Sequence, residues 1–235
     1  MTTSPAELSQ PQQLLELVEL VEKARRFAGC TIAELAALQA MPLPAAPERA
    51  KGFVGRLVER ALGVPGGGGA VTDFPECELK TLPVDVRGRP RESTFVCHVP
   101  LTHLVEVGWE ASRVRAKLAR VLFVPIESGP CAQADRRIGC AFLWEMGARQ
   151  EAVLRADYQC LADLIARGQL ERIDARWGTA LQIRPKAAHS GVRVRAHDTD
   201  GVPMRVLPRA FYLRAAFTGG LLRDALSFAE SECSR

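Results

Sequence analysis

The chain has 235 residues, of which 47% are hydrophobic and 25% are charged, proportions that are ordinary for a soluble globular protein. Its apolar runs fall far short of the roughly 18 residues that a membrane-spanning helix requires, and residues 1–13 lack the pattern of a secretion signal. Seven scattered cysteines form neither a CxxC pair nor a disulfide framework. We therefore expect reduced thiols, a cytoplasmic location and no membrane partner.

The net charge of +4 is too small by itself to indicate a nucleic-acid partner, but the basic residues are clustered. Residues 182–214 carry seven Lys or Arg against two Asp, and residues 112–120 carry four Lys or Arg and no acid. Such clusters are typical of proteins that bind phosphate backbones. A solvated face balanced by acids elsewhere explains them equally well.

Helices are predicted first in the chain, and strands begin only after a glycine-rich loop at residues 64–69. Apolar residues recur at helical spacing before that loop, and Thr31 with Glu34 forms the pattern of a capping box. The glycine loop is not a Walker phosphate cradle, because no Gly-Lys-Ser/Thr sequence follows it. The predicted helices of this part occupy residues 11–29, 30–40 and 51–63.

Strands and helices alternate in the rest of the chain, which predicts a mixed α/β fold. The predicted strand at residues 121–127, VLFVPIE, is apolar throughout except for its last residue, Glu127, as expected of a buried central strand. We expect a single domain spanning residues 1–235, in one body or two closely joined lobes. The other predicted strands are 76–84, 93–101, 180–185 and 210–217, and the predicted helices are 112–120, 148–168 and 218–232.

Charged side chains crowd one predicted strand and the turn before it, at Asp73, Glu76, Glu78 and Lys80. Residues two apart share a face of a strand, so Glu78 and Lys80 point the same way. Carboxylates that converge near one ammonium form an oxygen-rich pocket suited to Mg²⁺, and the lysine can position water and neutralise charge on a phosphate. This is chemistry for hydrolysing a phosphodiester. An exposed strand face with a Glu–Lys pair is the alternative.

Other candidates are less specific from the residues alone. Glu59 shares a helical stripe with Gly52 and Gly55, which leave that face open to close approach, although a solvated helix glutamate is the simpler interpretation. Phe95 and Tyr212 fit core aromatic positions equally well.

Seven segments, in order along the chain, together resemble the MutH family of endonucleases, which is related to the Sau3AI-type restriction enzymes. The resemblance covers most of the chain, so it is far more specific than any single motif. The segments are KGFVGRLVERALG, DFPECELKTLPVDVRGRP, ESTFVC, PLT, WEASRVRAKLARVLFVPIE, LQIRPKAA and LPRAFYLRAAFT.

The resemblance implies a restriction-endonuclease-like fold of the PD-(D/E)xK type, with a mixed sheet flanked by helices and two lobes around a DNA cleft. It implies an endonuclease of methyl-directed mismatch repair that binds double-stranded DNA at GATC sites. Such enzymes use Mg²⁺, with Mn²⁺ as an alternative ion, to nick the unmethylated strand of hemimethylated DNA. MutL activates them, and mismatch-bound MutS acts through MutL with ATP.

The resemblance also carries the family's site residues onto this chain. Asp73 and Glu78 correspond to the metal-binding acids, Lys80 to the catalytic lysine and Glu59 to a supporting helix glutamate. Among the expected DNA contacts, residues 184–186 form the reading loop, Tyr212 lies near the methyl position of adenine N6, and Phe95 packs or intercalates. The full set of expected DNA contacts is Lys51, Gly52, Phe95, Lys117, Arg184, Pro185, Lys186 and Tyr212.

The chemistry of these residue types agrees with those roles. Arg184 and Lys186 can donate to guanine O6 and N7 in the major groove, although alone they fit general phosphate contacts. Pro185 can meet a thymine methyl group. Tyr212 offers a ring and a hydroxyl, which can sense a methyl group on adenine by steric conflict.

One departure from the family concerns the spacing of the acids. The family usually has six residues between the first acid and the glutamate, whereas here four residues separate Asp73 from Glu78. Either a shorter turn before the strand absorbs the difference, or Glu76 takes part of the role of Asp73. Thr72, rather than proline, precedes Asp73, and the basic loop at 190–205 matches no family motif.

Two other functions stay open from the sequence. A restriction endonuclease of the same fold would cut both strands of unmethylated GATC without a partner. A GATC-binding module whose shortened motif has lost catalysis would bind the site and never cut it.

Overall fold

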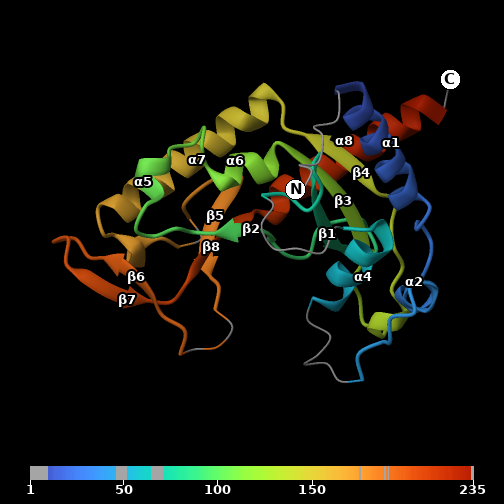
Figure 1. Cartoon of the computed structure of the whole chain (residues 1–235), viewed down its shortest axis with the longest axis horizontal. Coiled ribbons are helices and arrows are strands. Elements are labelled where there is room, and N and C mark those ends of the chain that lie inside the picture. Colours follow the sequence, from blue (N-terminus) through green and yellow to red (C-terminus); the bar gives the residue numbers. More distant parts are fainter. Residues whose placement is uncertain are drawn as a thin grey trace, which may run out of the picture. The chain divides into compact units, whose positions relative to one another are not determined.

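The computed structural model describes residues 10–45, 52–64, 71–174, 176–187, 189 and 191–233. The chain divides into two compact units. Unit 1 comprises residues 1–83 and 120–144, and unit 2 comprises residues 84–119 and 145–235. Helices and strands alternate along both units, which confirms the α/β class (Figure 1).

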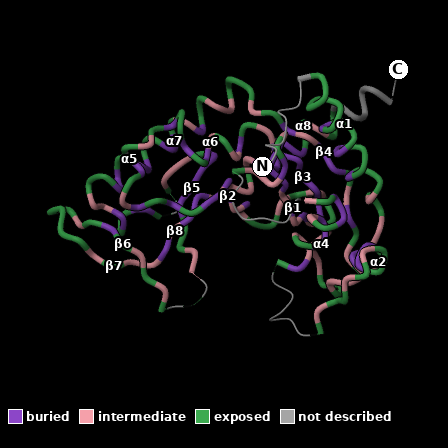
Figure 2. Tube along the Cα trace, in the orientation of Figure 1, coloured by how far each residue is buried: buried purple, intermediate pink, exposed green. Residues whose placement is uncertain are grey.

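Unit 1 contains a three-stranded sheet with the order β1-β3-β4. The central strand, β3, has six consecutive buried residues, so the prediction of a buried central strand is confirmed. The strands are β1 (Glu78–Val84), β3 (Arg120–Glu127) and β4 (Phe142–Glu145), and the helices are α1 (Gln10–Arg25), α2 (Ile32–Leu38) and α4 (Phe53–Leu62), with a short 3₁₀ turn at Gln133–Asp135. One apolar core joins these helices to the sheet, and Figure 2 shows buried positions along β3.

Local sequence signals set the ends of the helices in unit 1. The Glu34 N–H donates to Thr31 Oγ1 at 3.1 Å and the Thr31 N–H donates to Glu34 Oε2 at 2.7 Å, so the capping box of α2 is confirmed. Helix α4 begins after Gly52, whose φ of 73° lies in the left-handed region that favours glycine. Helix α1 ends at Arg25 rather than Gly29, because residues 26–29 form turns and the Gly29 N–H donates to Ile138 O.

Unit 2 contains a second three-stranded sheet, in which β8 lies between β2 and β5 and pairs with both in antiparallel fashion. A bulge between Phe95 and Cys97 shifts the register of β2 against β8. A separate two-stranded hairpin, β6–β7, lies between β5 and β8 in the sequence. The strands are β2 (Thr94–His98), β5 (Leu181–Pro185), β6 (Val194–His197), β7 (Pro203–Val206) and β8 (Arg209–Leu213), and the helices are α5 (Leu104–Val107), α6 (Arg113–Leu118), α7 (Ala148–Ala166) and α8 (Ala215–Cys233), with a 3₁₀ turn at Leu170–Arg172.

Helix α7 is fixed to the start of β5 by a buried carboxylate. Asp157 is 7% exposed and lies on the buried stripe of α7 that includes Leu154 and Leu161. Its oxygens accept hydrogen bonds from the backbone N–H groups of Thr179, Ala180 and Leu181 at 2.7 to 2.9 Å. The carboxylate therefore sets where β5 begins.

The structure differs from the sequence predictions mainly in short elements. The strand β4 was not predicted, and the basic loop expected at 190–205 contains the β6–β7 hairpin. The last strand and helix also meet earlier than expected, since β8 ends at Leu213 and α8 begins at Ala215. Every cysteine whose side chain the structure describes is a free thiol. None of the helices in the described part of the chain is long and apolar enough to cross a membrane.

Candidate functional site

The start of β1 carries a buried acid–lysine pair. Glu78 is 1% exposed, and Lys80 Nζ donates a hydrogen bond to Glu78 Oε1 at 2.5 Å. Both side chains lie on the same face of β1 because they are two residues apart. The side chain of Lys80 is 18% exposed, so the ammonium neutralises the buried carboxylate while keeping access to solvent. The alternative of a solvent-exposed Glu–Lys pair is therefore wrong.

Asp73 stays beside β1 despite the shortened segment. Its Oδ2 accepts a hydrogen bond at 2.9 Å from the N–H of Leu79, the residue between the acid and the lysine of the pair. A tight turn precedes the strand, in which the Phe74 N–H donates to Cys77 O at 3.0 Å. With this turn in place, the Asp73 carboxylate lies against the same stretch of strand as Glu78 and Lys80.

Glu59 approaches this group from helix α4. Burial raises the pKa of the Glu59 carboxyl, the negative charge of Asp73 raises it further, and the positive charge of Lys80 opposes the rise. Glu78 also raises this pKa, so the structure brings the other three predicted catalytic side chains, Asp73, Glu78 and Lys80, within electrostatic range of Glu59. A Cβ atom at Gly55 would have open space around it, so the α4 surface is uncrowded there.

Glu76 and Cys77, which lie between Asp73 and Glu78 in the sequence, differ in their suitability as metal ligands. Glu76 Oε1 is buried and has no hydrogen-bond partner among the residues that the structure describes. Burial raises the pKa of the Cys77 thiol to about 12, so this thiol is neutral near pH 7 and is a poor metal ligand or nucleophile. Glu76 therefore keeps an unsatisfied carboxylate oxygen next to the site.

The donor set at β1 fits a hard divalent cation. No group of three or more His, Cys, Asp and Glu side chains is arranged to hold a metal in the described ranges of the chain. Mg²⁺ often takes only one or two protein carboxylates and completes its shell with water and phosphate oxygens. Asp73 and Glu78 supply two such carboxylates, which is enough for a site that also includes a bound phosphodiester.

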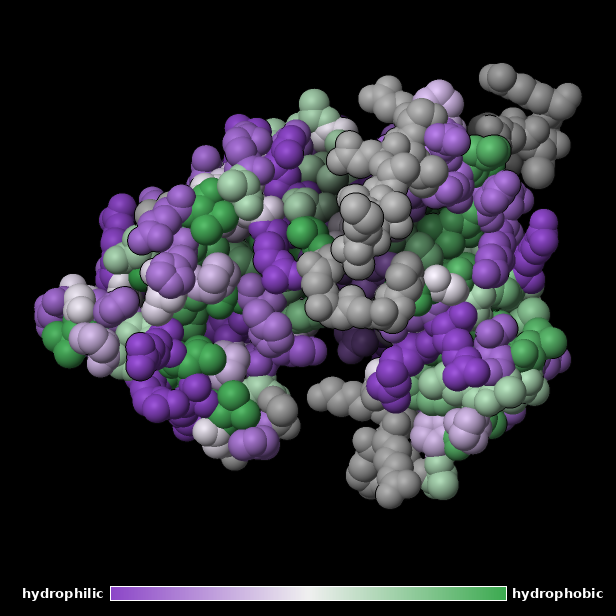
Figure 3. All heavy atoms as spheres, viewed as in Figure 1, coloured by the Kyte–Doolittle hydropathy of each residue, from purple (hydrophilic) through white to green (hydrophobic). Residues whose placement is uncertain are grey.

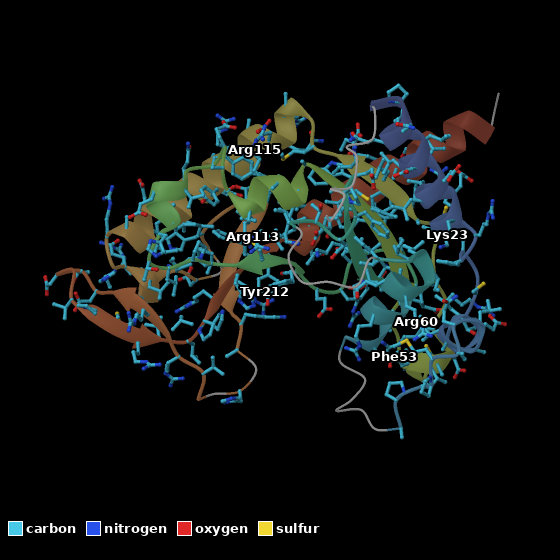
Figure 4. The ribbon with its side chains drawn as sticks, in the orientation of Figure 1. Lys23, Phe53, Arg60, Arg113, Arg115 and Tyr212 are labelled. Carbon is cyan, nitrogen blue, oxygen red and sulfur yellow. The ribbon has the colours of Figure 1, made fainter. Side chains whose placement is uncertain are left out.

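A second group of candidate residues gathers on the β2-β8-β5 sheet of unit 2. Tyr212, which extends from β8 (Figure 4), is opposite Phe95 of β2 and Gln182 of β5. The rings of Phe95 and Tyr212 meet edge to face, with centroids 5.7 Å apart. Two basic side chains cover these rings: Arg184 Cζ lies 5.8 Å from the Tyr212 centroid, and Lys186 Nζ lies 4.6 Å from the Phe95 centroid. Four predicted DNA contacts thus form one cluster of rings and cations.

The other predicted DNA contacts lie outside the ring and cation contacts of this cluster. Pro185 follows Arg184 at the exposed end of β5 and is paired in register with Arg209. Lys117 lies in the last turn of α6, and the ring and cation contacts of the cluster do not include it. Gly52 is the exposed residue before α4 in unit 1, and Lys51 lies outside the described residues.

The basic run at 112–120 is partly balanced by acids. Arg115 Nε lies 2.9 Å from Glu151 Oε1 and 3.3 Å from Glu110 Oε2. The Arg113 side chain is exposed on the same short helix, α6 (Figure 4). The run is therefore not a uniform basic face.

Sequence reasoning missed His98 and Asp157. His98 is exposed at the end of β2, and its ring meets that of Phe95 with centroids 5.6 Å apart. Its place inside the predicted strand at 93–101 gave no signal of this contact. Asp157 had a signal, because it lies three residues after Leu154 and four before Leu161 on the apolar stripe of a predicted helix.

The surroundings of Tyr212 keep its hydroxyl in the neutral form. Burial raises the pKa of the Tyr212 hydroxyl, while Arg184 opposes the rise, so the phenol stays neutral near pH 7. A neutral hydroxyl can both donate and accept a hydrogen bond. Tyr212 therefore presents a polar group and an aromatic edge at the same surface.

Comparison with known proteins identifies the family. A family model described as the DNA mismatch repair enzyme MutH matches residues 62–157. The DNA mismatch repair protein MutH of Serratia proteamaculans is 48% identical over 209 residues, which cover 87% of this chain and 91% of that protein. The MutH proteins of Pectobacterium atrosepticum and Vibrio vulnificus are 47% and 43% identical and cover 86% and 89% of this chain. The chain therefore belongs to the MutH family of DNA mismatch repair enzymes.

Proposed function

We propose that this chain is a Mg²⁺-dependent endonuclease that nicks the unmethylated strand of hemimethylated DNA at GATC sites. We further propose that MutL activates it and that MutS acts indirectly through MutL. One observation carries the proposal: Asp73, Glu78 and Lys80 meet at the start of β1, with Glu59 in electrostatic range. Family membership supports the place of this chemistry in mismatch repair.

The reaction is hydrolysis of one phosphodiester bond. The oxygen of a water molecule attacks phosphorus, the bond from phosphorus to the 3′ oxygen breaks, and the products are a 5′-phosphate and a 3′-hydroxyl. Asp73 and Glu78 would hold Mg²⁺, which when bound supplies Lewis-acid stabilisation of the phosphoryl charge. The hydrogen bond from the Leu79 N–H, 2.9 Å long, holds the Asp73 carboxylate in place for that role.

Lys80 and Glu59 handle charge and protons beside the phosphate. The Lys80 ammonium is held by Glu78, keeps partial access to solvent, and can bind the attacking water and offset charge that develops on the phosphate. Glu59 has a raised pKa, so it is a stronger base than an ordinary glutamate and can accept the proton that the water releases. Solvent water returns a proton to the departing 3′ oxygen.

The cluster on the β2-β8-β5 sheet is the proposed reading surface. Arg184 and Lys186 are the donors for guanine, and Tyr212 would lie against adenine N6, where a methyl group would clash with its ring or hydroxyl. The stacking of Lys186 over Phe95 and of Arg184 over Tyr212 restricts these side chains before DNA binds. Restricting them beforehand lowers the entropy lost on binding.

The test uses three duplexes that share one GATC site and are unmethylated, hemimethylated or fully methylated. The purified chain is incubated with each in Mg²⁺, with and without MutL and ATP, and the cut strand is identified on a denaturing gel. We expect nicks only in unmethylated strands, stimulation by MutL, and no nicks with Lys80→Ala or with the charge-conserving Lys80→Arg. Intact fully methylated DNA is the substrate control.

The other outcomes separate the competing functions. Efficient double-strand cleavage of unmethylated GATC without MutL would identify a restriction endonuclease. Selective GATC binding with no nick under any condition would identify a binding module that has lost catalysis. The contact between Asp73 and the β1 backbone favours retained catalysis, because the shortened segment still delivers the carboxylate to the strand.

A further inference from the structure

We propose that the β6–β7 hairpin is a second DNA contact, in which Arg195 and Arg205 bind backbone phosphates without reading sequence. The inference rests on the proposed function, since it assumes that duplex DNA is the ligand of unit 2. The hairpin falls within the basic loop that the family resemblance left without a role. Its two strands, β6 and β7, pair in antiparallel fashion (Figure 1), and strongly hydrophilic residues lie over this part of unit 2 in Figure 3.

The two faces of the β6–β7 hairpin differ in character, one basic and one apolar. Antiparallel pairing places Arg195 opposite Arg205 and Ala196 opposite Met204. Because successive residues alternate between faces, the arginine pair lies on one face and the Ala–Met pair on the other. Ala196 is 3% exposed, whereas both arginines are exposed. The arginine face therefore points to solvent and the apolar face packs inward.

Two like charges directly opposite each other destabilise a hairpin. Neither Arg195 nor Arg205 forms an ion pair with a carboxylate in the part of the chain that the structure describes. The acids of the hairpin are in its turn, where Asp198 Oδ1 accepts hydrogen bonds from the N–H groups of Asp200 and Val202 at 2.9 and 2.8 Å. A pair of arginines that forms no ion pair within the described residues is suited to binding a phosphodiester.

The hairpin is held at both ends. At its root, the Lys186 N–H donates to Pro208 O at 2.8 Å, which ties the segments that enter and leave it. At its turn, a Cβ atom on Gly168 would lie 2.0 Å from the carbonyl carbon of Asp198, so the turn packs directly on the backbone at the end of α7. The arginine face consequently has a fixed place within unit 2, and Arg195 follows the proposed reading residue Lys186 by nine residues in the same unit.

A cavity of about 900 Å³ extends the basic surface between the hairpin and the end of β2. No carboxylate is among the described residues that line it, and its basic lining consists of His98, His103, Arg195, His197 and Arg209. His103 already has a partner, because its Nδ1 lies 3.4 Å from Glu106 Oε2. The surroundings of Arg195 therefore favour an anion over a cation or an acidic side chain of the same chain.

The test measures DNA binding without cleavage, with Ca²⁺ in place of Mg²⁺, across a series of salt concentrations. Two duplexes are used, one with a hemimethylated GATC site and one with that site scrambled. For Arg195→Gln/Arg205→Gln we expect weaker binding by the same factor on both duplexes. We also expect the slope of log affinity against log salt to become shallower by about two, the change for two lost phosphate contacts.

Two control variants define the result. Arg149→Gln/Arg172→Gln removes the same charge from two exposed residues of unit 2 outside the hairpin, and we expect an unchanged slope. Arg195→Lys/Arg205→Lys keeps the charges, and we expect most of the parent slope. Circular dichroism and thermal melting must show that all three variants stay folded.

Three outcomes would overturn the inference. The first is an unchanged slope for Arg195→Gln/Arg205→Gln, which would assign the pair to a partner other than DNA. The second is an equal loss in the Arg149/Arg172 control, which would reduce the effect to net charge. The third is a loss confined to the GATC duplex, which would make the hairpin a reader of sequence. If instead the parent chain binds both duplexes equally, the proposed GATC specificity fails. The change in salt slope for Arg195→Gln/Arg205→Gln still tests the hairpin contact in that case.

Discussion

Glu78 is an almost completely buried carboxylate, and its ion pair with Lys80 compensates for that burial. Removing one member of a buried pair leaves the other charge without compensation, which is far more damaging than removing both. Lys80 thus has a structural role next to its proposed catalytic one. The two roles can be separated by choosing the replacement.

Lys80→Ala is expected to lower the free energy of unfolding by about 3 kcal/mol, near the low end for breaking a buried pair because Lys80 is partly exposed. Lys80→Arg should keep most of that stability, and Glu78→Gln/Lys80→Met should recover most of it. Urea unfolding followed by circular dichroism measures all three. An unaltered midpoint for Lys80→Ala would show that Glu78 finds another partner.

Glu59 has a raised pKa, and the sign of its linkage to stability follows from that direction. A carboxyl whose pKa is higher in the folded chain favours folding below its ordinary pKa, and this contribution is lost as pH rises through the raised value. Glu59→Gln should therefore raise the melting temperature at pH 7.5 by on the order of 1 to 2 °C. The gain should disappear below the ordinary pKa of glutamate.

The same residue sets the lower pH limit of the proposed reaction. Nicking by the parent chain should fall, as pH decreases, at a higher pH than an ordinary glutamate would give, because Glu59 becomes protonated and can no longer accept a proton. Initial nicking rates from pH 5 to 8 measure this, with DNA binding checked at each pH. A Glu59→Gln variant with parental rates would remove Glu59 from the mechanism.

The elements owe their positions to a few strong contacts, and the clearest is between α7 and β5. Asp157 accepts hydrogen bonds from three successive backbone N–H groups at the start of the strand that ends at Arg184. Gly178, just before this strand, has a φ of 80°, and a Cβ atom there would lie 1.8 Å from Leu181 O. The Asp157 hydrogen bonds and the close backbone approach at Gly178 together fix where the start of β5 lies against α7.

Asp157→Ala is expected to cost about 4 kcal/mol of folding free energy, because the buried N–H groups of Ala180 and Leu181 lose their acceptor. GATC binding should weaken as well, since β5 leads into the proposed reading residues. Asp163→Ala, which removes an exposed acid of the same helix, is the matched control and should change stability by less than about 0.5 kcal/mol. Equal losses of folding free energy in Asp157→Ala and Asp163→Ala would contradict the assignment of the effect to the Asp157 hydrogen bonds.

The sequence predicted elements well where a signal was long or paired, and poorly where it was short. The capping box at Thr31 and Glu34 and the six-residue apolar run of β3 were correctly predicted, because each depends on neighbouring residues alone. Strand β4 has four residues, too few for a period to be recognised. The β6–β7 hairpin did have a signal, since residues 192–197 alternate apolar and basic residues before an Asp-Gly turn.

For the candidate site, chain spacing predicted only part of the arrangement. The shared face of Glu78 and Lys80 follows from their separation by two residues, and the structure agrees. The approach of Glu59 to this pair, and of Lys186 to Phe95, depends on how distant segments pack, which no local pattern specifies. Those positions came from the family resemblance.

At the scale of the whole molecule, the proposed catalytic group lies in unit 1 and the proposed reading cluster lies in unit 2. Cutting and reading should therefore be separable by mutation. Lys80→Arg should abolish nicking and keep GATC binding, whereas Arg184→Ala/Lys186→Ala should weaken GATC binding by about 1 to 3 kcal/mol per lost base contact. Binding titrations and nicking assays on the same duplex measure both. Loss of binding in Lys80→Arg would show that the two functions are not independent.

Neither unit is a continuous piece of chain, because the chain passes between units at residues 83–84, 119–120 and 144–145. This has a consequence for biosynthesis. The first strand of unit 1 leaves the ribosome long before its central partner, β3, and the intervening segment belongs to unit 2. Synthesis of unit 2 begins before synthesis of unit 1 is complete, so the two units cannot fold one after the other during translation. A stalled chain ending at residue 119 would expose β1, with its charged pair, to any protease or chaperone nearby.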